Sequence, residues 1–229
     1  VLEKCQKQGG IAVTVTNERE CLMRKVGNYY INCECGKETS FTAAKSYMSQ
    51  TVIALLFAAV LSHDENVLEQ IKKAPDIIEK CLSDSIEEQV KKSIPLFRNV
   101  QDILLLGRGF SYAVANETEL KIMEASYTNA KAYSSCDYPH GPIATTKRFI
   151  PVIFFLTDEK TNESTIKLVE KMQKDFSIST LVVTNNKKYV SMANEAVLLP
   201  EEAEGVAGVF GMTVFSQLFA CLLSLARGY

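Results

Sequence analysis

The feature that most constrains the fold is the alternation of short, β-rich apolar runs with longer helical stretches. The clearest predicted strands lie at residues 11–16, 102–106, 151–156 and 180–184, and helical patterns follow them. A run such as 151–156 (PVIFFL) is apolar on both faces, so both faces of its sheet must be covered. Crossover helices provide that cover and join parallel strands. The sequence therefore predicts an α/β fold, with a doubly wound, mainly parallel sheet between two layers of helices.

The chain also resembles itself. The matched segments, at offsets of 168, 167 and 166, are 12–17 with 180–185, 48–50 with 215–217, and 28–33 with 194–199. Their constant order indicates two copies of one α/β unit, with chance similarity of short apolar strands as the alternative. Residues 101–179 precede the strand of the second copy, whereas only residues 1–11 precede that of the first. We therefore expect the first unit to be truncated at its N-terminus.

A charged and periodic stretch separates the two copies. Residues 65 to about 97 are typical of amphipathic helix, and Pro75 and Pro95 are expected to break it. The predicted organisation is residues 1–64 as the C-terminal part of the first unit, 65–100 as a helical linker, and 101–229 as the second unit.

Composition excludes several classes of function. The chain is 47% hydrophobic and 23% charged, as globular proteins are, and its net charge of −2 gives no reason to expect a nucleic acid or an anionic membrane as partner. Seven cysteines form no CxxC pair and only two histidines accompany them, so we expect no metal site. The cysteines are expected to be buried thiols in a reducing, cytoplasmic compartment.

Two uncharged segments, 46–62 and 205–226, are as apolar as membrane spans. Both contain Ser and Gln, and neither has an aromatic belt with basic flanks. We expect them to be helices buried in the core or at a subunit interface, with no membrane as partner.

A glycine turn follows the strand that begins the second copy. Residues 104–109 (LLLGRG) place backbone amides ahead of a helix, an arrangement that suits phosphate. The motif is neither GxGxxG nor a P-loop, so an ordinary tight turn is the alternative. We expect Arg108 to pair with a nearby carboxylate such as Glu117.

Candidate acid–base residues lie on the next helix and loop. Glu117, Lys121 and Glu124 share one helix face, which suits a general base with a neighbouring lysine; a solvated helix face is the alternative. His140 lies in a rigid YPHGP loop, where it can pair with Glu124 or be merely structural. His63 is expected to cap the end of its helix.

Residues 106–142 resemble the SIS (sugar isomerase) family, and most closely the isomerase half of glucosamine-6-phosphate synthase. The residues that match in order and spacing are Lys121, Glu124, Ser126, Tyr127, Ala132, Tyr133, His140, Gly141 and Pro142. Gly36, Glu38 and Lys45 resemble the GTE…STK segment of the family's first domain. The resemblance covers the whole chain and implies two SIS domains in tandem, in agreement with the internal repeat.

The resemblance also implies roles for individual residues. Glu124 would be the base that moves a proton between C2 and C1 of an open-chain sugar phosphate. His140 would open the sugar ring, in the active site of a neighbouring subunit, and Lys121 would lie near the substrate. No metal or cofactor is implied.

The first-domain segment would place Phe41, Thr42 and Ala43 at the substrate. Ala43 stands where the family has serine, and Phe41 is bulkier than usual. Cys136-Asp137 replaces the usual Gly-Glu and looks more like stand-alone amino-sugar-phosphate deaminases and deglycases. No glutaminase domain is visible.

We therefore expect a phosphosugar isomerase that acts on an amino-sugar or fructosamine 6-phosphate, either isomerising it or releasing the amine. It would be a homodimer whose active site is shared between subunits. The alternative is a sugar-phosphate-binding regulator that uses the fold without catalysis.

Overall fold

The computed structural model describes residues 1–147 and 149–229 and divides into two compact units, Val1–Leu68 and Glu69–Tyr229. Each unit is described on its own. Both contain parallel strands joined through helices, which confirms the predicted α/β class. The boundary lies near the start of the expected linker, so most of residues 65–100 belongs to the second unit.

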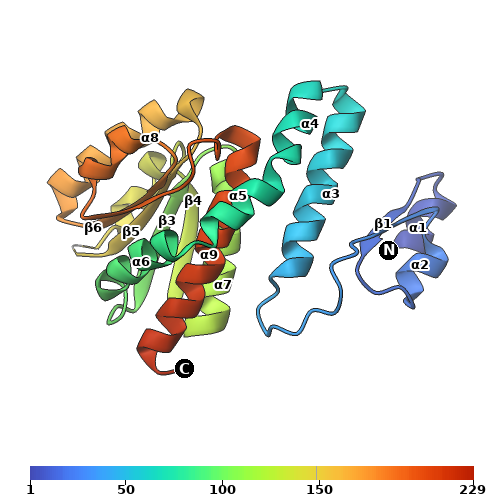
Figure 1. Cartoon of the computed structure of the whole chain (residues 1–229), viewed down its shortest axis with the longest axis horizontal. Coiled ribbons are helices and arrows are strands. Elements are labelled where there is room, and N and C mark those ends of the chain that lie inside the picture. Colours follow the sequence, from blue (N-terminus) through green and yellow to red (C-terminus); the bar gives the residue numbers. More distant parts are fainter. Residues whose placement is uncertain (148) are drawn as a thin grey trace. The chain divides into compact units, whose positions relative to one another are not determined.

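The second unit is built on a five-stranded parallel sheet with the order β4-β3-β5-β6-β7 (Figure 1). The strands are β3 (Asp102–Gly107), β4 (Asn129–Ser134), β5 (Pro151–Leu156), β6 (Ser179–Thr184) and β7 (Glu195–Leu198). The chain leaves β3 toward β4 on one side and then continues from β5 on the other. The carboxyl ends of β3 and β5 therefore form the switch point of a doubly wound sheet.

Helices cover both faces of this sheet (Figure 1). The long helices are α7 (Phe110–Ser126), α8 (Glu159–Phe176) and α9 (Gly205–Arg227). Short 3-10 turns complete the unit: η1 (Ile94–Leu96), η2 (Tyr138–His140), η3 (Pro142–Thr145) and η4 (Lys187–Met192). Helix α8 packs on β5 and β6, whereas α7 and α9 pack along each other on the opposite face.

Strand β5 shows why the central run is apolar on both sides. Val152, Phe154 and Leu156 lie in one cluster with α8 residues. The alternate Phe155 points the other way, and its ring lies 5.9 Å from that of Phe215 on α9. All six residues of β5 are buried, so the run PVIFFL is the middle of three layers.

The stretch expected to be a linker forms α4 (Glu65–Lys72), α5 (Ala74–Cys81) and α6 (Asp84–Ser93), with Pro75 in the first turn of α5 and Pro95 in η1. Both α5 and α6 pack against α9. Their apolar stripes require such a partner, because an amphipathic helix is stabilised mainly by burying that stripe. The Gln89 side chain also accepts a hydrogen bond from the Leu198 amide of β7, at 2.8 Å.

Helix α9 begins at Gly205, at the start of the uncharged segment 205–226 that the sequence predicts to be a helix. Glycines at 205, 208 and 211 disfavour helix. They are present because close packing requires small residues there. A Cβ on Gly208 would lie 2.7 Å from Thr157 Oγ1.

The first unit contains α1 (Leu2–Lys7), β1 (Val13–Thr16), α2 (Leu22–Val26), β2 (Tyr29–Asn32) and α3 (Lys45–Ser62). Strands β1 and β2 are parallel and joined through α2. Helix α3 ends at His63, a left-handed C-cap residue with φ 55°, as expected.

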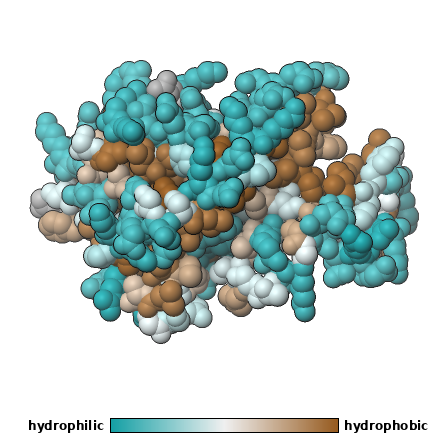
Figure 2. Space-filling view, in the orientation of Figure 1, coloured by the Kyte–Doolittle hydropathy of each residue, from teal (hydrophilic) through white to brown (hydrophobic). Residues whose placement is uncertain are grey.

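Helix α3 is not buried within the described chain, and its expected burial at a subunit interface stays a prediction. Both α3 and α9 are long and apolar enough to cross a membrane by length and composition alone, but 78% of the apolar window of α9 is buried and only 6% of that of α3. Ala59 is the one buried residue of α3, and Figure 2 shows hydrophobic side chains over this helix. Helix α9 is covered because it packs on α7, and the described residues of the first unit include no helix in the corresponding place.

Each unit contains a hydrogen bond that has its counterpart in the other unit. In the first unit, Asn28 Oδ1 accepts from the Ala12 amide at 2.8 Å. In the second, Asn194 Oδ1 accepts from the Thr180 amide at 2.7 Å. These residues correspond at the offsets of 166 and 168 found in the sequence, and the β1–β2 and β6–β7 registers correspond in the same way.

Candidate functional site

The candidate site centres on a lysine buried between two carboxylates of its own helix. On α7, Lys121 Nζ lies 3.1 Å from Glu117 Oε1 and 3.2 Å from Glu124 Oε2. Their spacings of four and three residues place the carboxylates one turn before and one turn after the ammonium. Lys121 is 4% exposed at its side chain and Glu124 33%, so Glu124 is the more accessible end of the cluster.

The packing of α7 against α9 explains why this part of the helix is enclosed. Thr118, one turn before Ile122, has its hydroxyl 2.6 Å from that of Ser216 on α9, and all three residues are fully buried. Lys121 is therefore not on a solvated helix face, which was the alternative reading of the motif.

Glu117 is the enclosed carboxylate of the cluster. Burial, the largest cause, raises its pKa, although the neighbouring Lys121 ammonium acts in the opposite direction. Its Oε1 is buried and makes the ion pair without a well-directed hydrogen bond from any described residue. The cluster therefore contains the Lys121 ammonium, the buried carboxyl group of Glu117, whose ionised form burial disfavours, and the more exposed carboxylate of Glu124.

The predicted pair of Arg108 with Glu117 is not formed. Glu117 is paired with Lys121, and Arg108 Nη1 instead donates to Ser164 Oγ on α8, at 2.8 Å. Arg108 precedes α7, near the carboxyl end of β3, and reaches toward the first turns of α8. Sequence spacing identified both residues, but it could not show which neighbour each one faces.

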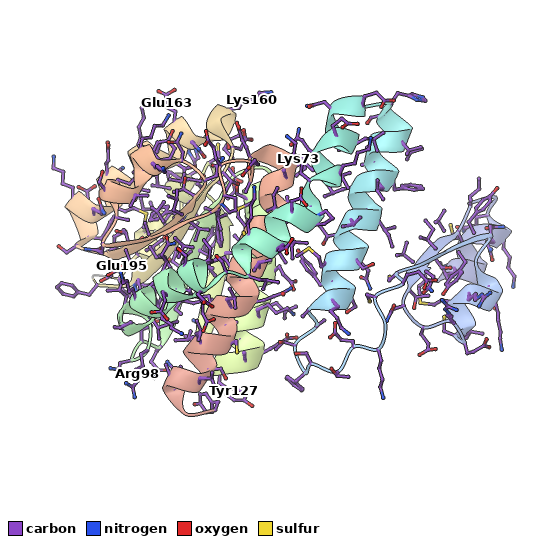
Figure 3. The ribbon with its side chains drawn as sticks, in the orientation of Figure 1. Lys73, Arg98, Tyr127, Lys160, Glu163 and Glu195 are labelled. Atoms are coloured by element: carbon purple, nitrogen blue, oxygen red, sulfur yellow. The ribbon has the colours of Figure 1, made fainter. Side chains whose placement is uncertain are left out.

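The glycine turn after β3 is explained by close packing. A Cβ on Gly107 would lie 2.6 Å from the Ser111 backbone, and Gly109 has a φ of 59°. The turn lets α7 begin directly above the strand. At its other end α7 stops at Tyr127, a left-handed residue whose ring lies 4.9 Å from that of Tyr229 beside the end of α9 (Figure 3).

The histidine loop is anchored by its tyrosine. Tyr138 is 2% exposed, its hydroxyl lies 2.7 Å from Thr146 Oγ1, and its ring packs on Tyr133. His140, two residues later in η2, is exposed. Within the described chain no hydrogen bond or ion pair joins His140 to Glu124, so the loop presents the imidazole outward.

The expected substrate-binding residues Phe41, Thr42 and Ala43 lie in the loop before α3, in the other unit. Phe41 is 89% exposed, and Thr42 Oγ1 lies 3.5 Å from Ser40 Oγ. The placement of this loop relative to Glu124 stays a prediction.

Glu38 has a role that the sequence did not reveal. Its carboxylate accepts hydrogen bonds from the Ala44 and Ser46 amides and from Ser46 Oγ, each at 3.0 Å. These bonds, foremost the one from the Ser46 amide, lower its pKa to about 2. Glu38 therefore caps the first turn of α3. An acidic residue shortly before a helix start was the available signal.

Each unit contains a cavity. One of about 380 Å³ is at the carboxyl ends of β6 and β7, and one of about 420 Å³ lies between β1, β2 and α3. Neither is lined by Lys121 or Glu124. Among the described residues, no group of three or more His, Cys, Asp or Glu side chains could hold a metal ion.

The SIS domain, as a family, matches residues 96–227 of this sequence. The chain belongs to the SIS domain family. This SIS chain is 27% identical, over 232 residues, to the glutamine–fructose-6-phosphate aminotransferase (isomerizing) of Pyrobaculum aerophilum. The match covers 99% of the chain but only 38% of that curated relative.

Solved structures share the SIS fold. The C-terminal domain of glucosamine-fructose-6-phosphate aminotransferase from Francisella tularensis matches with a TM-score of 0.88 and 19% identity, over 99% of this chain and 67% of that one. A glucosamine-6-phosphate deaminase from Thermotoga maritima matches with a TM-score of 0.73 and 20% identity, over 99% and 65%. The expected SIS resemblance is thus confirmed.

Proposed function

We propose that this SIS chain is the catalytic part of a phosphosugar isomerase that acts on an amino-sugar or fructosamine 6-phosphate, with Glu124 as its base. The observation that carries the proposal is the Lys121 cluster. Its partly exposed carboxylate stands beside a buried ammonium, which is the arrangement that proton transfer at a carbon next to a carbonyl needs. The relatives named for aminotransferase and deaminase activity support an amino-sugar phosphate as substrate.

The chemistry requires one base that serves two neighbouring carbons. Glu124 would take the proton from C2 of the open-chain sugar and return it to C1. The positive charge of Lys121, 3.2 Å from that carboxylate, would stabilise the enediolate or enolamine oxygen that forms between the two steps. Glu117 would hold Lys121 in place from the turn before. If the product is a ketimine, attack by water would release the amine.

The alternative is a regulator that binds sugar phosphate without catalysis. A binding protein has no need of a base beside an ammonium, so the cluster favours the enzyme. The substitution Glu124→Gln removes the charge but keeps the shape of the side chain, so it distinguishes the enzyme from the regulator.

The test is an isomerase and amine-release assay of Glu124→Gln with 6-phosphorylated amino sugars and fructosamines. The enzyme should lose about 10²–10⁴-fold in kcat while still binding substrate. Glu163→Gln is the matched control, because that carboxylate is exposed on α8 and paired only with Lys167 there. Full turnover in Glu124→Gln would reject Glu124 as the base.

We further propose that the first unit is a second SIS unit, in which β1, β2 and α3 correspond to β6, β7 and α9. The matched Asn28 and Asn194 hydrogen bonds support this tandem arrangement. We also propose a homodimer, supported by the uncovered apolar face of α3. In it, the exposed His140 opens the sugar ring in the neighbouring subunit.

A further inference from the structure

A second group of reactive side chains lies at the carboxyl end of β2, in the first unit. Cys33 and Cys35 flank Glu34 there, and both are free thiols. Cys33 is 7% exposed and Cys35 is half-buried. We propose that Cys33 and Cys35 form a reversible disulfide when the chain meets a peroxide. This modification site does not rest on the proposed function.

The backbone between the two cysteines brings them together. Glu34 has a φ of 51°, in the left-handed region that non-glycine residues rarely occupy. In an extended strand, Cα atoms two residues apart are separated by about 6.8 Å, which is the upper end of the range for a disulfide. A left-handed residue between them folds the chain back and shortens that separation.

This turn is held in place by side chains from the preceding segments. Arg19 Nη2 donates to the two carboxylate oxygens of Glu34, at 2.9 and 2.7 Å, and Asn32 Nδ2 donates to the same group. Asn17 Oδ1 accepts a hydrogen bond from the Cys35 amide at 3.3 Å, and Asn17 Nδ2 donates one to the Gly36 carbonyl. An unfavourable backbone conformation persists when its surroundings fix it in this way. The turn between the two cysteines is thus held in place before any bond forms.

The thiols also influence each other electrostatically. Burial, the largest cause, and the charge of a Cys35 thiolate both raise the pKa of Cys33, against weaker effects of Ser49 and Gln50. A thiolate on Cys35 therefore disfavours a second negative charge on Cys33. Cys33 stays a protonated, enclosed thiol, while the more exposed Cys35 is the one that a small oxidant reaches first.

The reaction proceeds in two balanced steps. The Cys35 sulfur attacks a peroxide oxygen; the O–O bond breaks, one oxygen leaves as water, and Cys35 becomes a sulfenic acid. The Cys33 sulfur then attacks the Cys35 sulfur, and its thiol proton leaves with the sulfenic oxygen as a second water. Two thiols are oxidised by two electrons, and one peroxide is reduced to two waters. A dithiol reductant reverses the change.

Closure would stiffen the start of the loop that leads to Phe41–Ala43. The Cys33 carbonyl also accepts a hydrogen bond from Ser49 Oγ of α3, so the turn is tied to that helix. The disulfide would thus act on the loop and helix together.

Peptide mapping of the whole chain tests the proposal directly. Trypsin cuts after Lys25 and Lys37, and the resulting peptide 26–37 contains Cys33 and Cys35 and no other cysteine. After treatment with equimolar hydrogen peroxide and alkylation of remaining thiols, this peptide should carry no alkyl group and weigh two hydrogen atoms less. Dithiothreitol should restore both alkylation sites.

Variants provide the controls. Cys35→Ser should abolish closure, and Cys33→Ser should leave a sulfenic acid at Cys35 that dimedone traps. Cys136→Ser and Cys221→Ser, at exposed thiols, should close as the parent chain does. The proposal is overturned if peptide 26–37 stays fully alkylated while other cysteines oxidise, or if Cys35 pairs with a different cysteine. The parent-chain mapping decides this even where a variant fails to fold.

Discussion

Lys121 is an ammonium group enclosed on α7 between carboxylates one turn away on either side. Burial of this positive charge is tolerable because the two glutamates compensate it, and it compensates their negative charges. The spacing of Glu117, Lys121 and Glu124 was readable in the sequence, so the cluster itself could be predicted. Its enclosure could not, because it depends on how α9 packs along α7.

We expect Lys121→Met to lower the free energy of unfolding by about 3 kcal/mol at pH 8, since it leaves Glu117 buried without a counter-charge. Lys121 lowers the pKa of Glu117, so the variant should bind a proton there more readily. Because the pKa of Glu117 is raised in the folded state, its protonated form stabilises the fold. This contribution to the free energy of unfolding is full below pH 4.5 and is lost as the pH rises through the pKa of the folded state. The deficit should therefore be smaller at pH 5 than at pH 8.

Urea denaturation at both pH values measures this, and Lys167→Met, in an exposed pair on α8, should change little. A deficit that is equal at pH 5 and pH 8 would contradict the role given to Glu117. Adding Glu117→Gln to Lys121→Met should recover part of the loss.

Helix α3 owes its first turn to a single carboxylate. Glu38 accepts from two amides and one hydroxyl at the start of the helix, and its pKa is about 2. Without Glu38, these two amides and the hydroxyl would have to donate their hydrogen bonds to water. The cap therefore couples the stability of the helix start to the ionisation of one side chain.

We expect Glu38→Gln to lower the free energy of unfolding of the first unit by about 1 kcal/mol at pH 7, the usual value of an N-terminal cap. A depressed folded pKa gives stability that is present above 4.5 and lost as pH falls toward 2. The difference between parent and variant should shrink across that interval. Urea denaturation followed by helical circular dichroism at pH 7 and pH 3 measures it. Glu20→Gln, exposed in the same unit, should show no such pH dependence.

Strands were easier to predict than helix ends. Runs 151–156 and 180–184 lie within β5 and β6 almost residue for residue, because buried parallel strands have a dense apolar signal. Near the start of α9, Gly208 disfavours helix locally and is there for close contact with Thr157. Tertiary packing decided that end, and a single sequence does not display it.

The residues that we propose for catalysis and substrate binding belong to different units. Lys121, Glu124 and His140 lie in the second unit, and the loop with Phe41–Ala43 lies in the first. Helix α3 meanwhile leaves Val60 and Leu61 more than half exposed. Sequence patterns predicted an apolar helix there, but not that the described chain would leave it uncovered.

If His140 serves the neighbouring subunit, two inactive variants should complement each other. We expect Glu124→Gln and His140→Ala homodimers to be inactive separately. Mixed and allowed to exchange subunits, they should regain roughly a quarter of the parent activity, because half of the dimers are mixed and each holds one intact site. Native mass spectrometry resolves the mixed dimers and confirms exchange, and full exchange without recovery would place His140 in the same subunit as Glu124.

The matched hydrogen bonds of Asn28 and Asn194 also bear on the order in which the chain folds. Each asparagine ties the start of one strand to the start of the next, across only 16 and 14 residues. Closing so short a loop costs little chain entropy, whereas pairing β3 with β5 must wait for a much longer one. We therefore expect the β1–β2 pair and the β6–β7 pair each to form early in folding, and independently of each other.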